Sequence, residues 1–357
     1  MASVRSDTVE RNLKRWCGST NRAPALAVLI IVEELDNFQI VGDCYRLGHS
    51  VIICQSIGGR FSNWKYGFVL PLGDAADDRD LAVVAEDSGW DGFFVWEPVW
   101  GYDAWVQLAA AATVTKRIRL GTMLSPVSRM RPWKLAGETV ALDRLSNGRL
   151  ILSVGPGSVD SGFEEFGEET DRRKRAELVD EGLDILTGLW KGQPFSYDGK
   201  HYNVKPTNFY PPKPPVQKPR IPIWIVGAWP RMKSMRRVLR YDGLLPMVIA
   251  KDGAQQATPS DIRSMKQYVE KNRKLSTPFD VVVEGRTPGN DPQKARATIR
   301  PWQEAGATWW IETMWNEMDN RDLKQLVTKR LKQGPPKGVK SRNERIVRHS
   351  LTSTKLM

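Results

Sequence analysis

From Lys65 to Pro336 the chain repeats one unit eight times: a short β-branched or aromatic run followed by a segment with helical periodicity. This alternation is typical of βαβ units, in which helices join parallel strands. Eight such units over roughly 270 residues is the size of a (β/α)8 TIM barrel, which is the α/β fold we predict. A doubly wound open sheet is the alternative. It is disfavoured because Pro71-Leu72-Gly73-Asp74, after the first strand, lacks a Gly-x-Gly-x-x-Gly pattern.

Capping residues and glycines mark the ends of the predicted elements. The predicted strands are residues 66–70, 92–96, 118–124, 150–154, 223–226, 243–249, 279–283 and 308–312. The predicted helices are residues 78–88, 103–115, 132–145, 172–190, 231–240, 260–272, 292–305 and 320–331. After the fourth helix, residues 191–221 contain a hairpin signal at Asp198-Gly199 and a Pro-rich stretch. We predict an excursion over one face of the barrel there.

The two flanks of this pattern differ from it. Residues 1–64 show helix-like and strand-like fragments with no matching partner, and we predict a poorly matched, loosely ordered N-terminal extension. Residues 65–336 form the predicted barrel domain, and residues 337–357 a basic tail. The net charge is +12, but a basic tail contacts nucleic acid or membranes only non-specifically, so no specific nucleic-acid partner is expected.

Cysteine and histidine are scarce in the barrel. All three cysteines precede residue 65, and only His201, predicted to be a surface hairpin residue, lies in the barrel domain. A hydrolase triad, a disulfide framework and a zinc site are therefore not expected, and we predict no metal. A carboxylate–magnesium or Schiff-base enzyme stays open through Glu97, Glu312 and several lysines. With no membrane-length apolar run and no signal sequence, the predicted location is the cytoplasm.

The ends of the predicted strands are rich in glycine and tryptophan. In a TIM barrel these positions form the active site. They include Trp96-Glu97-Pro98-Val99-Trp100, Gly121-Thr122-Met123-Leu124-Ser125, Gly155-Pro156-Gly157-Ser158, Gly227-Ala228-Trp229-Pro230 and Glu312-Thr313-Met314-Trp315. Glycine lets a backbone approach a ligand and tryptophan offers flat apolar area, so a planar heterocycle with a phosphate tail fits. The alternative is that the tryptophans plug the barrel and the glycines turn corners.

Several motifs, in order, resemble the luciferase-like monooxygenases, including their deazaflavin (coenzyme F420) branch. The motifs are Ala82-x-x-Ala85-Glu86-x-x-Gly89-Trp90-Asp91, Ile118-Arg119-Leu120-Gly121-Thr122, Pro132-x-x-Leu135-Ala136, Leu142-Asp143-Arg144-Leu145-Ser146-Asn147-Gly148-Arg149, Val154-Gly155-Pro156-Gly157, Glu181-Gly182-Leu183-Asp184-Ile185-Leu186, Pro222-Ile223-Trp224-Ile225-x-Gly227 and Tyr241-Asp242-Gly243. Asp143, Ser146, Gly148 and Arg149 are expected to be structural, with Arg149 at the bottom of the barrel.

The resemblance implies a cofactor, coenzyme F420 or FMN, at the C-terminal end of the barrel. It implies a cis peptide at Met123-Leu124, and a cofactor phosphate cradled by the amides of Gly227 and Ala228 near Trp229. Arg129 and Arg131 would add charge, unless they belong to a solvated loop. The cofactor-binding residues implied in this way are Thr122, Met123, Leu124, Arg129, Gly155, Gly157, Ser158, Gly227, Ala228 and Trp229.

Two positions depart from the family pattern. The family often has Asp-His after the second strand, where this chain has Glu97-Pro98, and one deazaflavin subgroup has an acidic residue where this chain has Ser158. Glu97 and Ser158 are nevertheless the candidate catalytic residues.

The resemblance implies a flavin- or F420-dependent oxidoreductase that acts on a small organic substrate by hydride transfer or oxygen insertion. The Trp-rich blocks around Pro222 to Gly243 and at Trp309-Trp310-Ile311-Glu312 favour the F420 branch. The alternatives are a non-catalytic or degenerate flavin-binding barrel subunit and, third, nucleic-acid binding through the tail, which predicts affinity that falls steeply with salt. A homodimer stays open.

Overall fold

The computed structural model describes residues 28–33, 44–47, 50–55, 64–208, 213–251 and 253–336. The chain divides into two compact units, Met1–Asn63 and Trp64–Met357. In the first unit, β1 (Val28–Glu33), β2 (Cys44–Leu47) and β3 (Ser50–Gln55) form an antiparallel sheet in the order β1-β3-β2. These strands pair with one another, although the sequence showed no matching partner for them. Residues 337–357 lie outside the described residues.

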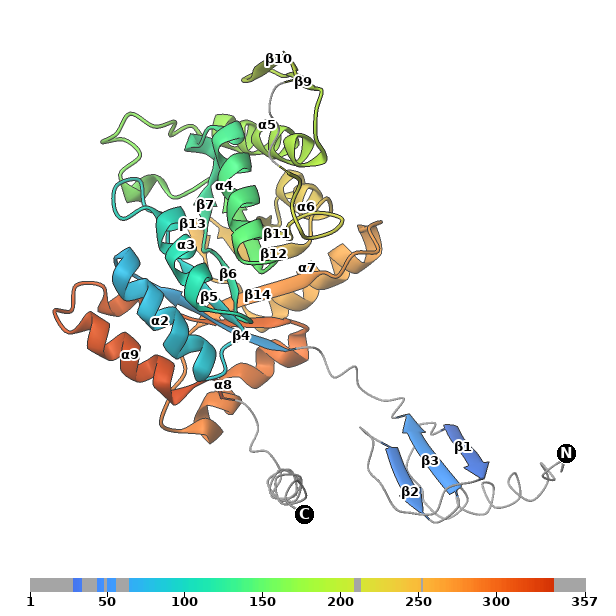
Figure 1. Ribbon diagram of the computed structural model, residues 1–357. Coiled ribbons are helices and arrows are strands. Elements are labelled where there is room, and N and C mark those ends of the chain that lie inside the picture. The colour runs from blue at the N-terminus through green and yellow to red at the C-terminus, as the bar shows by residue number, and fades with distance from the viewer. Residues whose placement is uncertain are drawn as a thin grey trace, which may run out of the picture. The chain divides into compact units, whose positions relative to one another are not determined.

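The second unit is a closed barrel of eight parallel strands, as predicted (Figure 1). The strands are β4 (Lys65–Leu70), β5 (Gly92–Val95), β6 (Arg119–Thr122), β8 (Leu150–Gly155), β11 (Ile223–Trp229), β12 (Gly243–Ala250), β14 (Asp280–Gly285) and β15 (Trp309–Glu312). Each strand pairs in parallel with the next, and β15 pairs with β4. This closure excludes the doubly wound open sheet.

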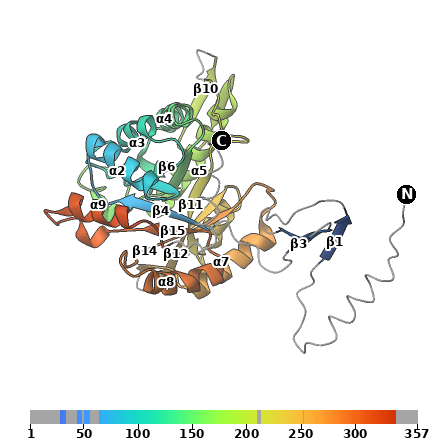
Figure 2. The same ribbon diagram turned by 60° about the horizontal axis from the view of Figure 1, so that its bottom comes forward.

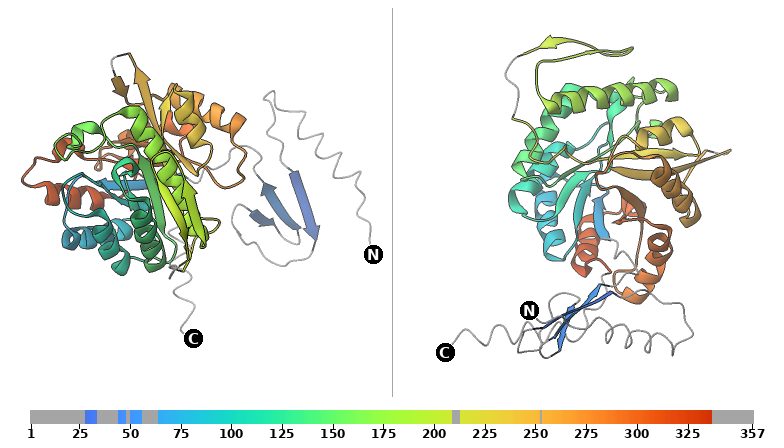
Figure 3. Two further views of the ribbon diagram at one scale, coloured as in Figure 1. Left: turned by 90° about the horizontal axis from the view of Figure 1, so that it is seen from above. Right: turned by 90° about the vertical axis from the view of Figure 1, so that its right-hand side faces the viewer.

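Helices between the strands surround the barrel (Figure 3). They are α2 (Ala75–Asp87), α3 (Ala104–Val114), α4 (Pro132–Leu145), α5 (Arg172–Lys191), α6 (Met232–Val238), α7 (Pro259–Asn272), α8 (Pro292–Ala305) and α9 (Leu323–Gln333). Their first turns carry the expected signals. The Asp103 side chain accepts hydrogen bonds from two amides of α3, and Thr258 and Asp261 form a capping box on α7.

Large aromatic rings fill the barrel interior below the strand ends. Phe94 and Trp309 both contact Trp224, with ring centroids 5.5 and 5.1 Å away, and all three side chains are fully buried. Glycine provides the room: a Cβ atom on Gly243 would stand 2.2 Å from the Trp224 ring. The interior is therefore a packed core rather than a pore.

A buried ion pair joins the last strand to the last helix. The Glu312 carboxylate accepts hydrogen bonds from Arg330 Nε at 3.1 Å and from the amide and hydroxyl of Thr287, both at 2.8 Å. The Arg330 guanidinium also lies 5.0 Å from the centre of the Trp90 ring. Glu312 thus points away from the barrel axis and binds Arg330 of α9. It is therefore not one of the carboxylates that could hold a magnesium ion at the mouth, and of the two candidates Glu97 is left.

The predicted structural role of Arg149 is confirmed. Its guanidinium donates hydrogen bonds to the Thr115 hydroxyl and to the carbonyls of Ala112, Thr115, Ile118 and Ser146. It therefore ties the end of α3 to the turn that precedes β8, at the end of the barrel opposite the predicted site.

The excursion after α5 contains the predicted hairpin, β9 (Phe195–Asp198) and β10 (Asn203–Thr207). His201, between the two strands, was predicted to be a surface residue, which is wrong. Its side chain is only 12% exposed because Nε2 lies 2.7 Å from the Glu177 carboxylate of α5. Glu181, one turn further along α5, accepts hydrogen bonds from the amides of residues 200–202. Two acidic residues of α5 thus hold the hairpin loop.

Candidate functional site at the mouth of the barrel

The mouth is the layer of side chains above the interior core, at the carboxyl ends of the strands. Leu124, Met247 and Trp315 pack on top of the buried interior cluster. The rings of Trp96 and Trp315 meet edge to face, 6.4 Å apart between centroids. Gly155 borders this layer, since a Cβ there would stand 2.9 Å from Val226 and 3.2 Å from Leu124. The mouth is therefore lined mainly by apolar and aromatic groups.

The Met123–Leu124 peptide bond follows β6 and is cis, as predicted. Met123 belongs to the buried interior cluster, whereas Leu124 is half-buried and lies on top of it. Two consecutive side chains thus contact the interior cluster, which interrupts the alternation of the strand. The chain then continues into the short strand β7 (Ser125–Pro126) and the 3-10 helix η1 (Val127–Arg129).

Glu97 lies in the barrel wall rather than in the centre of the mouth. Ser125 Oγ donates a hydrogen bond to Glu97 Oε2 at 2.5 Å, and the Thr122 hydroxyl lies 2.8 Å from the same Ser125 oxygen. One serine proton cannot serve both contacts, so a second proton comes from Thr122 or from a neutral Glu97. The three side chains form a short hydrogen-bonded chain between the ends of β5 and β6.

Burial raises the pKa of Glu97 to about 7. The hydrogen bond from Ser125 and the charge of Arg129 act in the opposite direction and are outweighed. Glu97 therefore changes charge close to neutral pH, which is the range in which a carboxyl group can both hold and release a proton.

Two arginines organise the loops behind this wall. Arg129 donates to the Pro98 carbonyl at 2.7 Å, which fixes the loop after β5. Arg175 of α5, which sequence reasoning did not single out, donates to the Gly157 carbonyl at 2.9 Å. Arg129 was predicted to add positive charge near a cofactor. Part of its guanidinium instead donates a hydrogen bond to the protein backbone.

The loop after β8 places its predicted residues differently. Gly157 has a φ of +75°, which favours glycine, and a Cβ there would stand 2.6 Å from Phe163. Ser158 is exposed, and its carbonyl accepts a hydrogen bond from the Ser161 hydroxyl at 2.7 Å. Gly155 therefore borders the mouth, Gly157 is required by the turn itself, and the Ser158 side chain faces outward.

The residues predicted to cradle a phosphate have contacts of their own. A Cβ on Gly227 would stand 2.3 Å from Leu244 and 3.0 Å from Val238, so this glycine lets α6 pack on the barrel. The Ala228 amide donates to Ser234 Oγ at 2.9 Å. Trp229 packs with the outer core and meets Tyr268 of α7 edge to face at 6.2 Å. The structure brings Thr122, Leu124, Gly155 and Glu97 together at one side of the rim but turns Trp229 away.

Glu284 is the mouth residue that sequence reasoning missed. On β14 it stands two positions after Val282, which belongs to the interior cluster, so strand alternation directs it toward the mouth. Trp315 Nε1 donates to Glu284 Oε2 at 3.3 Å. The side chain is exposed to the hollow, and desolvation by the protein atoms around it raises its pKa. Its position just after the predicted strand 279–283 was the available signal.

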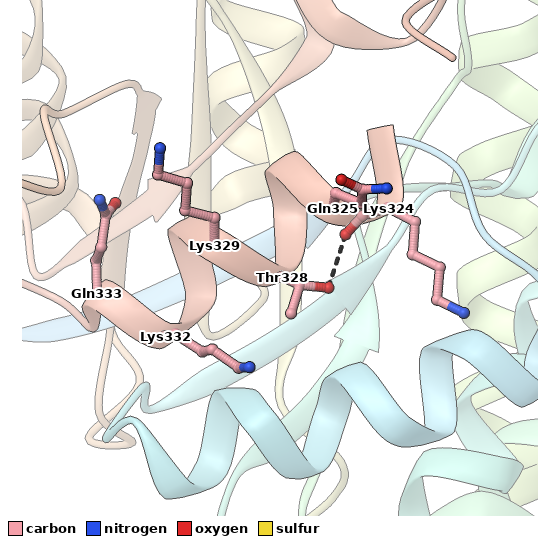
Figure 4. Close-up of a pocket in the computed structure, with 6 residues that line it drawn as sticks. All are labelled: Lys324, Gln325, Thr328, Lys329, Lys332 and Gln333. Carbon is pink, nitrogen blue, oxygen red and sulfur yellow. Dashed lines mark hydrogen bonds between the residues drawn. The ribbon is translucent and has the colours of Figure 1, made fainter. Parts of the chain in front are cut away.

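A hollow of about 330 Å³ lies beside Glu284. Its lining comes from β12, the segment around β13 (Gly253–Gln255), β14 and α8. A second hollow of about 580 Å³ lies along α9, and its lining residues, among them Lys324, Lys329 and Lys332, all belong to that helix (Figure 4). Neither hollow is lined by a predicted site residue, but the smaller one lies at the carboxyl ends of β12 and β14, so it is the candidate ligand site.

Two kinds of feature are absent from the part of the chain that the structure describes. No group of three or more histidine, cysteine, aspartate or glutamate side chains is arranged to hold a metal ion. Within the same residues, no helix combines the length and the apolar character needed to cross a membrane.

A closed barrel of eight parallel strands, with its candidate ligand site at the carboxyl ends of the strands, places the chain in the class of TIM-barrel proteins. Sequence comparison identifies the group within that class, because residues 62–343 match the luciferase-like monooxygenase family. The chain belongs to this family, as the motifs predicted.

The chain is also similar to individual curated proteins. Uncharacterized proteins of Mycobacterium tuberculosis and Mycobacterium bovis are 35% identical over 138 residues. This match covers 39% of the chain and 47% of each relative, so the chain spans about half the length of the curated relatives it matches.

Solved structures share the fold at low sequence identity. A coenzyme F420 dependent tetrahydromethanopterin reductase from Methanopyrus kandleri is 17% identical with a TM-score of 0.59, over 75% of this chain and 98% of that one. The oxygenating constituent of a diketocamphane monooxygenase from Pseudomonas putida, solved with FMN, is 16% identical with a TM-score of 0.59, over 77% and 99% of the two chains. At these identities the likeness shows the fold alone.

Proposed function

We propose that this chain is a flavin- or deazaflavin-dependent oxidoreductase that acts on a small organic substrate by hydride transfer or oxygen insertion. The observation that carries the proposal is the mouth of the barrel. Its rim combines Leu124, Gly155 and two indoles with the proton-holding chain from Glu97 through Ser125 to Thr122. Family membership supports the same function.

Coenzyme F420 and FMN both fit the chemistry of this rim. A tricyclic ring is flat and largely apolar, and the half-buried Leu124, which packs closely on Gly155 because that residue has no Cβ, offers it an apolar surface. Such a cofactor supplies the hydride or the activated oxygen when bound. The protein supplies the surface under the ring and a Glu97 carboxyl that titrates near neutral pH.

Two neighbours in structure illustrate the choice between cofactors. The Methanopyrus reductase depends on coenzyme F420, and the Pseudomonas monooxygenase was solved with FMN. For this chain we favour coenzyme F420, as the Trp-rich blocks suggested. Preferential binding and turnover of reduced FMN would contradict this preference.

The experiment is a titration of the purified protein with coenzyme F420 and with FMN, followed by visible absorbance and cofactor fluorescence. We expect one of them to bind, and Gly155→Val to weaken that binding by at least about tenfold, because branched carbons would displace Leu124 and Val226 from under the ring. Gly137→Ala is the matched control, since a Cβ there meets nothing within 4 Å. Equal melting temperatures would show that the variants are folded.

The outcome also separates the catalytic from the degenerate barrel. Substrate-dependent oxidation or reduction of the bound cofactor supports an enzyme. Binding without turnover of any tested alcohol, ketone or aldehyde would indicate a non-catalytic flavin-binding subunit. If neither cofactor binds to the folded protein, the proposed function is wrong.

A further inference from the structure

The barrel wall opens between β12 and β14. These neighbours pair only at Gly243 with Asp280 and at Leu244 with Val281, although both strands continue further. Beyond that point β12 turns back on itself and pairs with β13 instead. The hollow of about 330 Å³ occupies the opening, on the side of the barrel where Figure 2 shows β12, β14 and α8.

The walls of this opening, which we call the β12–β14 cleft, are mostly apolar. They include Leu245, Met247, Ala257, Val282 and Trp302. Its volume is near the lower end of the range for ligand pockets, so it suits one small molecule rather than a tricyclic ring with a phosphate tail. The cleft thus lies beside the mouth and has the size of a substrate rather than a cofactor.

Glu284 is the ionisable group that the described residues place in the cleft. Its Oε2 accepts the Trp315 hydrogen bond, and among the described residues Oε1 has no protein partner. No charged side chain is among the causes that shift its titration, which are burial and the Trp315 contact. Gln255 and Gln256 are the other polar side chains that line the cleft. A carboxyl group with one free oxygen and no counter-ion in such a cleft is a recognition group for an uncharged polar atom.

We propose that the β12–β14 cleft binds the organic substrate, an uncharged and largely apolar small molecule whose hydroxyl or carbonyl oxygen hydrogen-bonds to Glu284. This proposal rests on the proposed function, which it deepens by naming the substrate class. Burial favours the neutral acid, which donates a hydrogen bond to a carbonyl and accepts one from a hydroxyl. The charged carboxylate can still accept from a hydroxyl but cannot donate to a carbonyl.

The test measures dissociation constants by ligand-observed NMR, with no cofactor present, for cyclohexanone, cyclohexanol and cyclohexylamine. These probes share a ring and differ in the polar group. For the ketone we expect Glu284→Ala to weaken binding about tenfold, because the ketone loses one hydrogen bond. Glu284→Gln keeps a donor and an acceptor and should bind the ketone nearly as well as the wild type.

The dependence of ketone affinity on pH distinguishes a residue that binds the ketone from one that only supports the fold. Ketone affinity of the wild type should fall as the pH rises through the raised pKa of Glu284, because the donor proton is lost. Alcohol affinity should change little, and Glu284→Gln should show no such fall. Glu317→Gln is the matched control, since that carboxylate pairs with Arg286 and is not among the residues of the cleft.

Met247→Trp should weaken binding of all three probes, because a larger ring would fill the cleft. The proposal is overturned if folded Glu284→Ala binds the ketone as the wild type does, or if cyclohexylamine binds most tightly, which would assign the site to cations. Cofactor titration is a separate measurement. If a cofactor binds but ketone binding does not depend on Glu284, only this inference is wrong. If the ketone binds through Glu284 but neither cofactor binds, only the proposed function is wrong.

Discussion

Asp78, in the first turn of α2, is a fully buried carboxylate whose two oxygens have no hydrogen-bond partner within the described ranges. Burial raises its pKa to about 7, and the nearby charges of Asp74 and Asp77 add to the effect. A hollow of about 20 Å³ beside it, next to Gly73 and Gln107, has room for one water molecule. Charging this group in the folded protein is therefore costly.

This cost predicts that stability falls with rising pH. The folded protein keeps the Asp78 proton up to about pH 7, whereas an unfolded aspartate loses it near pH 4. The free energy of unfolding should therefore decrease between about pH 4 and pH 7 and level off above that. Glu97, whose pKa is also raised to about 7, contributes to the same decrease, so Asp78→Asn should reduce it and, at pH 8, raise the free energy of unfolding by up to about 4 kcal/mol. Urea titrations at several pH values measure it; a parallel decrease in both proteins would contradict it.

Residue roles were the least predictable part of the chain from sequence. Glu97 could be placed at a strand end, but its hydrogen bonds with Ser125 and its burial depend on how β5 and β6 lie together. Trp229 is the last residue of β11, at an outward position, and it packs on Tyr268. A sequence gives the position along a strand, whereas the face depends on where the strand begins, and a shift of one residue reverses it.

Elements were predictable because their signals are local. The predicted strand 150–154 is β8 with one more residue, and helix 260–272 is α7 with one more, since Thr258 and Pro259 define its start. The last helix was predicted from residue 320 but begins at Leu323, because the preceding residues form turns. The β12–β14 cleft could not be predicted, since it follows from strands that separate, which involves residues far apart in sequence.

The buried ion pair between Glu312 of β15 and Arg330 of α9 holds the last helix on the barrel. Glu312→Ala would leave the Arg330 guanidinium buried beneath α9 without its counter-ion. We expect it to lower the free energy of unfolding by about 3–5 kcal/mol. The exposed pair of Arg300 and Glu304 is the control, where Glu304→Ala should change it by less than about 1 kcal/mol. Chemical denaturation measures both, and equal effects would contradict the assigned role of Glu312.

At the scale of the whole molecule, the barrel closes on itself and its ends are joined by long-range bonds. β15 pairs with β4, and Trp90 Nε1 donates to the Leu331 carbonyl at 3.0 Å. The Tyr66 hydroxyl donates to the Pro336 carbonyl at 3.4 Å. First and last elements of the barrel are thus in direct contact.

These contacts predict that residues 64–336 fold without the flanking segments. The shortened protein should unfold in one cooperative transition at a temperature close to that of the full chain, because the contacts that close the barrel are retained. Differential scanning calorimetry of both proteins measures this. A large loss of stability would show that residues outside 64–336 contribute to the barrel, contrary to the predicted domain boundaries.

The packed rings of Phe94, Trp224 and Trp309 determine from which side a ligand can enter and leave the barrel. Because these rings block the axis of the barrel, a ligand that binds at the carboxyl ends of the strands cannot leave through the amino ends. Entry and departure must share one side of the molecule. Because β12 and β14 separate toward the carboxyl ends of the strands, a small ligand in the cleft between them and a cofactor at the rim would exchange through this same side.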